Sequence, residues 1–220
     1  MSWTENPPVV VVLARHFNPS IFNPVWLAKH GILNETGDYK PDSVFTGQLV
    51  QVVTDDFVLV VTNDQMQFIL LASPERHSVL IEEKVGTLIR KLPEVPYRAV
   101  GLNFNWHNAL DANRLAEETR QLFAGRTDGI YSCFTEPNAR FGAYLSKDFG
   151  PFRMKLDVKP ILVEMEGVKG DRIQFAFNFH HDLPAERNAP DALFDLIGQW
   201  NAVRTETVKT IKTVGFREQL

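Results

Sequence analysis

The order in which strand-like and helix-like segments follow one another is the feature that most constrains the fold. Runs of β-branched and aromatic residues predict strands, and apolar residues spaced three or four apart predict helices. Along the 220 residues these signals give a strand, a helix, three strands and a helix, and then the same order again. We therefore predict an α+β fold made of two tandem β-α-β-β-β-α units, with an antiparallel sheet and helices packed mainly on one face. The units would span residues 1–95 and 96–220.

The first unit begins with a β-branched run that follows two prolines. The pairs Asp55-Asp56 and Asn63-Asp64 are typical of turns and separate three closely spaced strands, so these strands should pair antiparallel. A short helix capped by Asn23 precedes them, and a second helix starts at Ser78 and ends before Pro93. The strands expected here are residues 9–17, 44–53, 57–62 and 65–71.

The second unit repeats this order and ends in the longest helical pattern of the chain. A helix that includes Leu115 and Phe123 on its apolar face follows the first strand. The strands expected are residues 97–106, 139–145, 152–165 with a break at Pro160, and 172–183. An apolar stripe then predicts one unbroken helix over residues 191–214.

Two short sequence matches support a duplication. Phe17-Asn18 corresponds to Phe104-Asn105 in the opening strands, and Gln67-Phe68 corresponds to Gln174-Phe175 in the last strands. The repeated order of elements carries more of the argument than these matches do, and a coincidence of order remains the alternative.

Composition excludes several classes of protein. The net charge of −4 gives no general attraction to nucleic acid or to an anionic membrane. Cys133 is the single cysteine, which excludes an internal disulfide and fits a reducing compartment. No apolar run approaches the roughly 18 residues of a membrane helix, and the N-terminus lacks the pattern of a signal peptide. We expect a soluble cytoplasmic protein.

One strand departs from the alternation expected of a sheet with one face in water. All five residues of the strand at positions 57–61 are apolar, so both faces of this strand should be covered, either by the same chain or by a partner. The leading hypothesis is a non-enzymatic binding or assembly module that recognises another protein or its own copy, as a homodimer. The candidate partner-binding residues are Phe57, Val58, Leu59, Val60 and Val61.

Two other patterns define the alternative functions. Arg153, Lys155 and Lys159 fall on one face of an alternating strand and could bind an anion, which would make the chain a nucleic-acid-binding protein.

The second alternative is a metal-dependent hydrolase that uses His180, His181 and Asp182. Adjacent strand residues point to opposite faces, which argues against joint binding of one ion by the two histidines. No glycine-rich nucleotide motif is present and no cofactor is expected.

The chain resembles a sporadically distributed family of bacterial proteins that has no assigned activity. The resemblance begins at Asn6-Pro7-Pro8-Val9, where the family has a similar entry into its first strand, and extends over nearly the whole chain. Where that family tends to carry arginine-tyrosine-isoleucine-asparagine, this chain has Gly101-Leu102-Asn103-Phe104-Asn105. The resemblance implies a bacterial protein and carries over no catalytic residue.

Overall fold

The computed structural model describes residues 3–109, 114–123, 129–165, 168–184 and 189–214. Its strands are β1 (Trp3–Glu5), β2 (Val9–Ala14), β3 (Val44–Phe45), β4 (Val50–Val53), β5 (Phe57–Val61), β6 (Gln65–Leu70), β7 (Tyr97–Ala109), β8 (Ala143–Phe149), β9 (Phe152–Met165) and β10 (Val168–Asp182).

The described part of the chain has six short α-helices and four helical turns of other types. The α-helices are α1 (Pro24–Lys29), α2 (His77–Leu80), α3 (Gly86–Lys91), α4 (Leu115–Phe123), α5 (Ala189–Ile197) and α6 (Trp200–Val214). Three 3-10 turns and a π-helical turn complete the set: η1 (Pro19–Ile21), η2 (Pro74–Arg76), η3 (Ile81–Val85, the π-helical turn) and η4 (Gly129–Cys133). Within the described residues, none of the helices has the length and apolar character needed to cross a bilayer.

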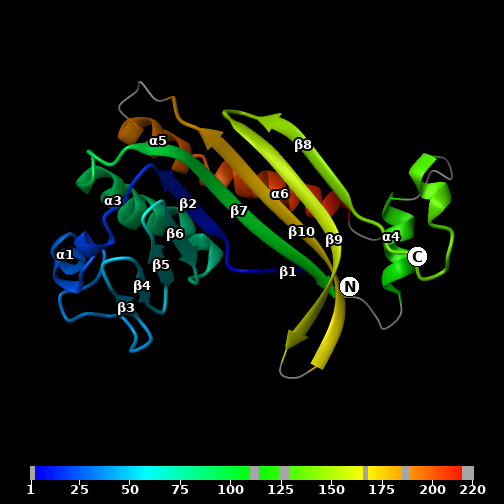
Figure 1. The fold of residues 1–220 in the computed structure, drawn as a ribbon, viewed down its shortest axis with the longest axis horizontal. Coiled ribbons are helices and arrows are strands. Elements are labelled where there is room, and N and C mark those ends of the chain that lie inside the picture. Colours follow the sequence, from blue (N-terminus) through cyan, green and yellow to red (C-terminus); the bar gives the residue numbers. More distant parts are fainter. Residues whose placement is uncertain (1–2, 110–113, 124–128, 166–167, 185–188, 215–220) are drawn as a thin grey trace.

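All strand pairs are antiparallel and form one continuous sheet in the order β3-β4-β5-β6-β2-β7-β10-β9-β8, with β1 paired to β7 (Figure 1). Strands β2 and β7 lie side by side in the middle, with Val10 opposite Leu102 and Val12 opposite Val100. The sheet therefore runs without interruption from the first half of the chain into the second. The prediction of an α+β fold with an antiparallel sheet is confirmed, whereas the division into two units stays a prediction.

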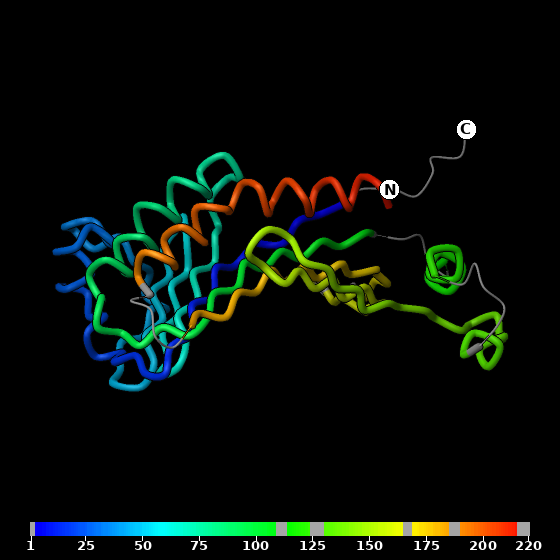
Figure 2. Tube along the Cα trace, turned by 90° about the horizontal axis from the view of Figure 1, so that it is seen from above, coloured from blue at the N-terminus to red at the C-terminus, as the bar shows by residue number. Residues whose placement is uncertain are grey.

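One side of the sheet is covered by helices. Figure 2 shows the run from α2 to α3 together with α5 and α6 along the same side of the strands. The indole of Trp200 is 1% exposed, and its ring centroid lies 4.7 Å from that of Phe104. Burial of a large apolar side chain contributes roughly 1.5–3 kcal/mol. Five of the 16 phenylalanines of the chain lie in this core, on the helix side of β7, β9 and β10: Phe104, Phe152, Phe175, Phe177 and Phe179.

The predicted terminal helix is broken, so the prediction of one helix over residues 191–214 is wrong. Helix α5 ends at Ile197, and the N–H of Gln199 donates to the carbonyl of Leu196 at 3.1 Å, which tightens the last turn. Glycine is a poor helix former, and Gly198 occupies this position. The helix expected from Ser78 is also irregular, because η3 lies between α2 and α3.

Strand boundaries differ from the prediction for local reasons. The expected break at Pro160 is wrong, because β9 continues and Pro160 lies opposite Ile173. Strand β8 reaches only to Val158 of β9, so Pro160 lies where β9 has become an edge strand, and edge strands tolerate proline. The strand expected over residues 44–53 is divided into β3 and β4 by a turn in which the N–H of Thr46 donates to the carbonyl of Leu49.

The two sequence matches behave differently in the structure. Phe17 lies beyond the end of β2, whereas Phe104 lies within β7, so the first pair of landmarks does not occupy equivalent strand positions. In the second pair, Phe68 and Phe175 are both buried and their preceding glutamines are both half-buried.

The contact between α3 and α5 depends on the absence of a side chain at Gly86. A Cβ at this position would lie 2.8 Å from Cε2 of Phe194. We expect Gly86→Ala to lower the free energy of unfolding by about 1–3 kcal/mol, despite the better helix propensity of alanine. Denaturant unfolding measures this loss. Adding Phe194→Ala should relieve the clash, so the double variant should lose less than the sum of the single variants, and a simple sum would contradict the proposed contact.

Candidate functional site

The side of the sheet opposite the helices, here called the open face, is not covered by any helix of the described residues. Residues directly opposite one another in a sheet share a face, so the strand register identifies what this face carries. One line of partners crosses eight strands: Val53, Val58, Ile69, Val9, Asn103, Asn178, Lys155 and Ser146. A second line runs beside it: Gln51, Val60, Gln67, Val11, Gly101, His180, Arg153 and Asp148.

Six neighbouring strands of the open face carry no ionisable side chain over a continuous area, which we name the uncharged patch. Charged residues are 23% of the chain, so their absence from a water-facing sheet surface is unusual. All members except the small residues Ala99 and Gly101 are half-buried. The patch consists of Gln51 and Val53 on β4, Val58 and Val60 on β5, Gln65, Gln67 and Ile69 on β6, Val9, Val11 and Leu13 on β2, Ala99, Gly101, Asn103 and Asn105 on β7, and Gln174, Ala176 and Asn178 on β10.

The middle of the sheet contributes amides to the patch. The Nδ2 of Asn178 donates to Oδ1 of Asn103 at 2.7 Å, and the Nε2 of Gln174 donates to Oδ1 of Asn105 at 3.3 Å. A side-chain amide can donate two hydrogen bonds and accept two. One pairing for each amide therefore leaves capacity for polar contacts with a molecule that covers this face.

Strand β5 divides its five apolar side chains between the two faces. Phe57, Leu59 and Val61 are at most 2% exposed and face the helix-covered core. Val58 and Val60 are half-buried and lie on the open face. The candidate interaction residues are thus reduced to these two, while the remaining three are core residues. The sequence identified this strand as unusual but did not determine its orientation.

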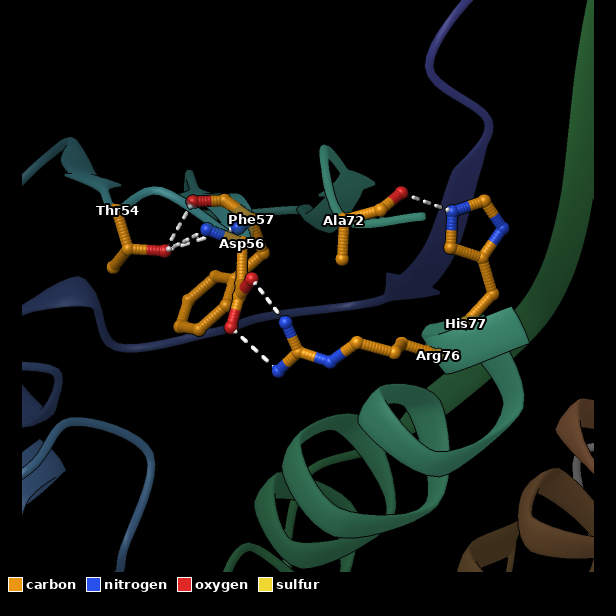
Figure 3. A network of polar contacts seen from close by, with 6 residues as sticks. All are labelled: Thr54, Asp56, Phe57, Ala72, Arg76 and His77. Carbon is orange, nitrogen blue, oxygen red and sulfur yellow. Dashed lines mark hydrogen bonds and ion pairs between the residues drawn. The ribbon is translucent and has the colours of Figure 1, made fainter. Parts of the chain in front are cut away.

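A polar network at the β4–β5 turn fixes that orientation (Figure 3). The Oγ1 of Thr54 accepts from the N–H groups of Asp56 and Phe57 at 3.2 and 3.0 Å, and it donates to the carbonyl of Phe57 at 2.9 Å. The guanidinium of Arg76 binds both carboxylate oxygens of Asp56 at 2.6 and 2.7 Å, which ties the turn to the start of α2. A slip of one residue would exchange the faces of β5, and the turn opposes that slip.

The basic residues of β9 lie on the open face, beside the uncharged patch. Arg153 pairs with Asp148 at 2.9 Å, and Lys159 pairs with Asp157 at 2.8 Å. Lys155 lies between them in the alternating pattern. Because nearby carboxylates offset part of this positive charge, the strand presents a mixed surface at the edge of the patch.

The three residues of the metal hypothesis do not share a face. The Nε2 of His180 lies 3.1 Å from Oδ1 of Asp182 on the open face, whereas the Nδ1 of His181 lies 2.6 Å from the carbonyl oxygen of Pro151 on the helix side. Among the residues that the structure describes, no three His, Cys, Asp or Glu side chains are grouped so as to hold a metal ion.

Sequence reasoning missed most of the patch and one buried titratable group. The patch residues on β6, β7 and β10 occupy alternate positions of their strands, and β2 is apolar throughout, so these two patterns were the available signal. The buried group is His77, which is 2% exposed and donates from Nε2 to the carbonyl of Ala72 at 2.9 Å (Figure 3). Nothing in the sequence around His77 indicated its burial.

The comparisons with known proteins give no relative. No family model, curated protein or solved structure matches this chain. The resemblance to the sporadically distributed bacterial family therefore stays a prediction.

Because β5 has one buried and one open face, the same kind of substitution should lower the free energy of unfolding by different amounts on the two faces. Leu59→Thr places a hydroxyl in the core and removes apolar contacts, so we expect it to lower the free energy of unfolding by about 2–4 kcal/mol. Val58→Thr keeps the β-branched shape on the open face and should cost less than about 1 kcal/mol. Denaturant unfolding of both variants measures the difference. Equal costs would contradict the orientation of β5.

The burial of His77 predicts a pH dependence of stability. Burial lowers the pKa of His77 below its ordinary value of 6.5, the bond to Ala72 opposes this, Arg204 lowers the pKa further, and Glu5 and Glu75 raise it. Well above pH 6.5 the imidazole of His77 is neutral in both the folded and the unfolded chain, so protonation of His77 does not reduce the free energy of unfolding there. As the pH falls below this value, the unfolded chain binds the proton first and the stability decreases.

We expect His77→Gln to flatten the fall in unfolding free energy between about pH 7 and pH 5. Denaturant titrations at several pH values measure this slope. Burial also lowers the pKa of His107, so His107→Gln is the matched control. This variant should keep the part of the pH dependence of the unfolding free energy that is due to His77. A slope unchanged by His77→Gln would show that this residue does not carry the effect.

Proposed function

We propose that the protein is a non-enzymatic binding or assembly module, and that another protein or a second copy covers its uncharged patch. The observation that carries this proposal is the contrast between the two faces of one sheet. Helices bury one face, whereas the uncharged patch on the other face extends over six strands and carries valine, leucine, isoleucine, amide and small side chains but no charge.

The energetics support an interface of this kind. Full burial of a Val, Leu or Ile side chain contributes roughly 1.5–3 kcal/mol. The half-buried aliphatic members of the patch have gained only part of this free energy within their own chain. Val9, Val11, Val58, Val60 and Ile69 lie next to one another across β2, β6 and β5. Together they offer enough apolar surface to offset the several kcal/mol lost when two bodies associate.

The rival functions have weaker support. A nucleic-acid-binding role would use Arg153, Lys155 and Lys159, but two of these three side chains form ion pairs with neighbouring carboxylates. A metal-dependent hydrolase would need His180 and His181 on one side of β10. Their hydrogen bonds on opposite faces weigh against it.

We also propose that the two halves arose by duplication. The opening strands of the two halves, β2 and β7, pair in the centre of the sheet. Moving outward from the centre, the other strands follow in reverse chain order in both halves: β6, β5 and β4 on one side, and β10, β9 and β8 on the other. Superposition of β2, β4, β5 and β6 on β7, β8, β9 and β10 in a crystal structure tests this. Strands that cannot be matched in that order would refute it.

A bacterial cytoplasmic location completes the proposal. The exposed free thiol of Cys133 is consistent with a reducing compartment, and the bacterial origin depends on the family resemblance. Cell fractionation of the native host, with detection of this protein, tests the location. Recovery outside the cytoplasm would overturn it.

Photo-crosslinking in the native cells tests whether a protein covers the patch. A benzophenone amino acid replaces Val60 or Gln67 on the open face, and Val79, which is 52% exposed on the helix side, serves as the control position. We expect an adduct of one defined mass from the open-face positions and none of that mass from position 79. Absence of any adduct from both open-face positions would contradict the proposed function.

A further inference from the structure

We infer that the partner of the uncharged patch is a second copy of this chain, packed open face against open face in a two-fold symmetric dimer. This inference rests on the proposed function and names its partner. The charge, the area and the arrangement of the side chains on the patch favour this partner.

The charge distribution favours a partner with the same surface. A partner of opposite charge would find nothing to pair with on β2, β4, β5 and β6, because their open-face residues are aliphatic or amide. A charged partner surface would also lose its hydration without compensation. A second copy brings an equally uncharged surface, and it is present wherever the chain is present.

The area of the patch suits a specific dimer. Adjacent strands lie about 4.8 Å apart and alternate residues about 6.8 Å apart, so six strands with on average about three patch residues each cover about 600 Å² per copy. Two such faces bury about 1,200 Å² in total, which exceeds the roughly 1,000 Å² expected of a biological interface.

The arrangement of side chains is complementary to itself. A two-fold axis near β2 and β6 places the aliphatic residues Val9, Val11, Val60 and Ile69 of one copy against the same residues of the other, as an isologous contact requires. Packed sheets keep their strands within about 30° of each other. The basic residues of β9 then lie toward the outside of the contact, where their charges remain hydrated.

Sedimentation equilibrium of the purified full-length chain tests the dimer. We expect the wild type to have twice the 25.0 kDa mass of the chain at about 100 μM and to dissociate on dilution. Val58→Lys with Val60→Lys places two charges in the patch and should weaken the dimer by about a hundredfold or more. The matched control is Val25→Lys with Val79→Lys, which adds the same charges at positions 79% and 52% exposed outside the patch and should leave the dimer intact.

A single isosteric change makes the test independent of side-chain size. Gln67 lies on the second line of partners, opposite both Val11 and Val60. Gln67→Glu adds a carboxylate from each copy near the axis and should weaken the dimer by about tenfold or more, whereas Gln67→Leu should preserve it. Circular dichroism like that of the wild type and cooperative thermal unfolding of the monomeric variants show that they are folded, which keeps the comparison valid.

Three results would overturn the inference. They are a wild type that stays monomeric at about 100 μM, a patch variant that dimerises as tightly as the control, and equal affinity of the Gln67→Glu and Gln67→Leu variants. A monomeric wild type together with a crosslinked adduct to another protein at position 60 would refute the second copy while leaving the binding function in place. A monomeric wild type without any adduct would refute both.

Discussion

The antiparallel pairing of β2 with β7 is the contact on which the rest of the structure depends. It joins strands that begin 88 residues apart, at Val9 and Tyr97, and so makes one sheet from the two halves of the chain. Because the register places Val10 and Val12 on the same side as Leu102 and Val100, both halves present their core to the same layer of helices. The opposite face is continuous for the same reason, and without this pairing the uncharged patch would not exist.

The two faces of the sheet differ in chemistry as well as in cover. On the helix side, Phe104 and Phe177 lie directly opposite each other in β7 and β10, and the ring of Phe104 lies close to that of Trp200. One residue away on the same strands, Asn103 and Asn178 pair their amides on the open face. Alternation along a strand thus separates a permanent core from a surface that can be covered by a partner, and a change at one face need not disturb the other.

The sequence predicted the order of the elements, the antiparallel pairing and the alternation of β9, because these depend on neighbouring residues. It did not predict the break at Gly198, because a single glycine within an apolar stripe does not by itself end a helix. It did not predict the continuity of β9 through Pro160, because this depends on where β8 ends. Patterns within single strands were the available signal for the patch, but the sequence did not show which strands lie side by side. Val9 and Asn103 become neighbours only through the central pairing, and the orientation of Val58 is set by the turn at Thr54 and by the ion pair of Asp56 with Arg76.

Hydroxyl-radical footprinting over a dilution series measures most directly whether the open face is an interface. Oxidation of Val58, Val60 and Ile69 reports on the patch, and oxidation of Val25 and Val79 reports on exposed aliphatic side chains elsewhere. Our account predicts that the patch residues are protected in concentrated protein and react faster on dilution, while Val25 and Val79 react at a constant rate. Patch residues that react at the same rate at every concentration, as the two reference valines do, would contradict it.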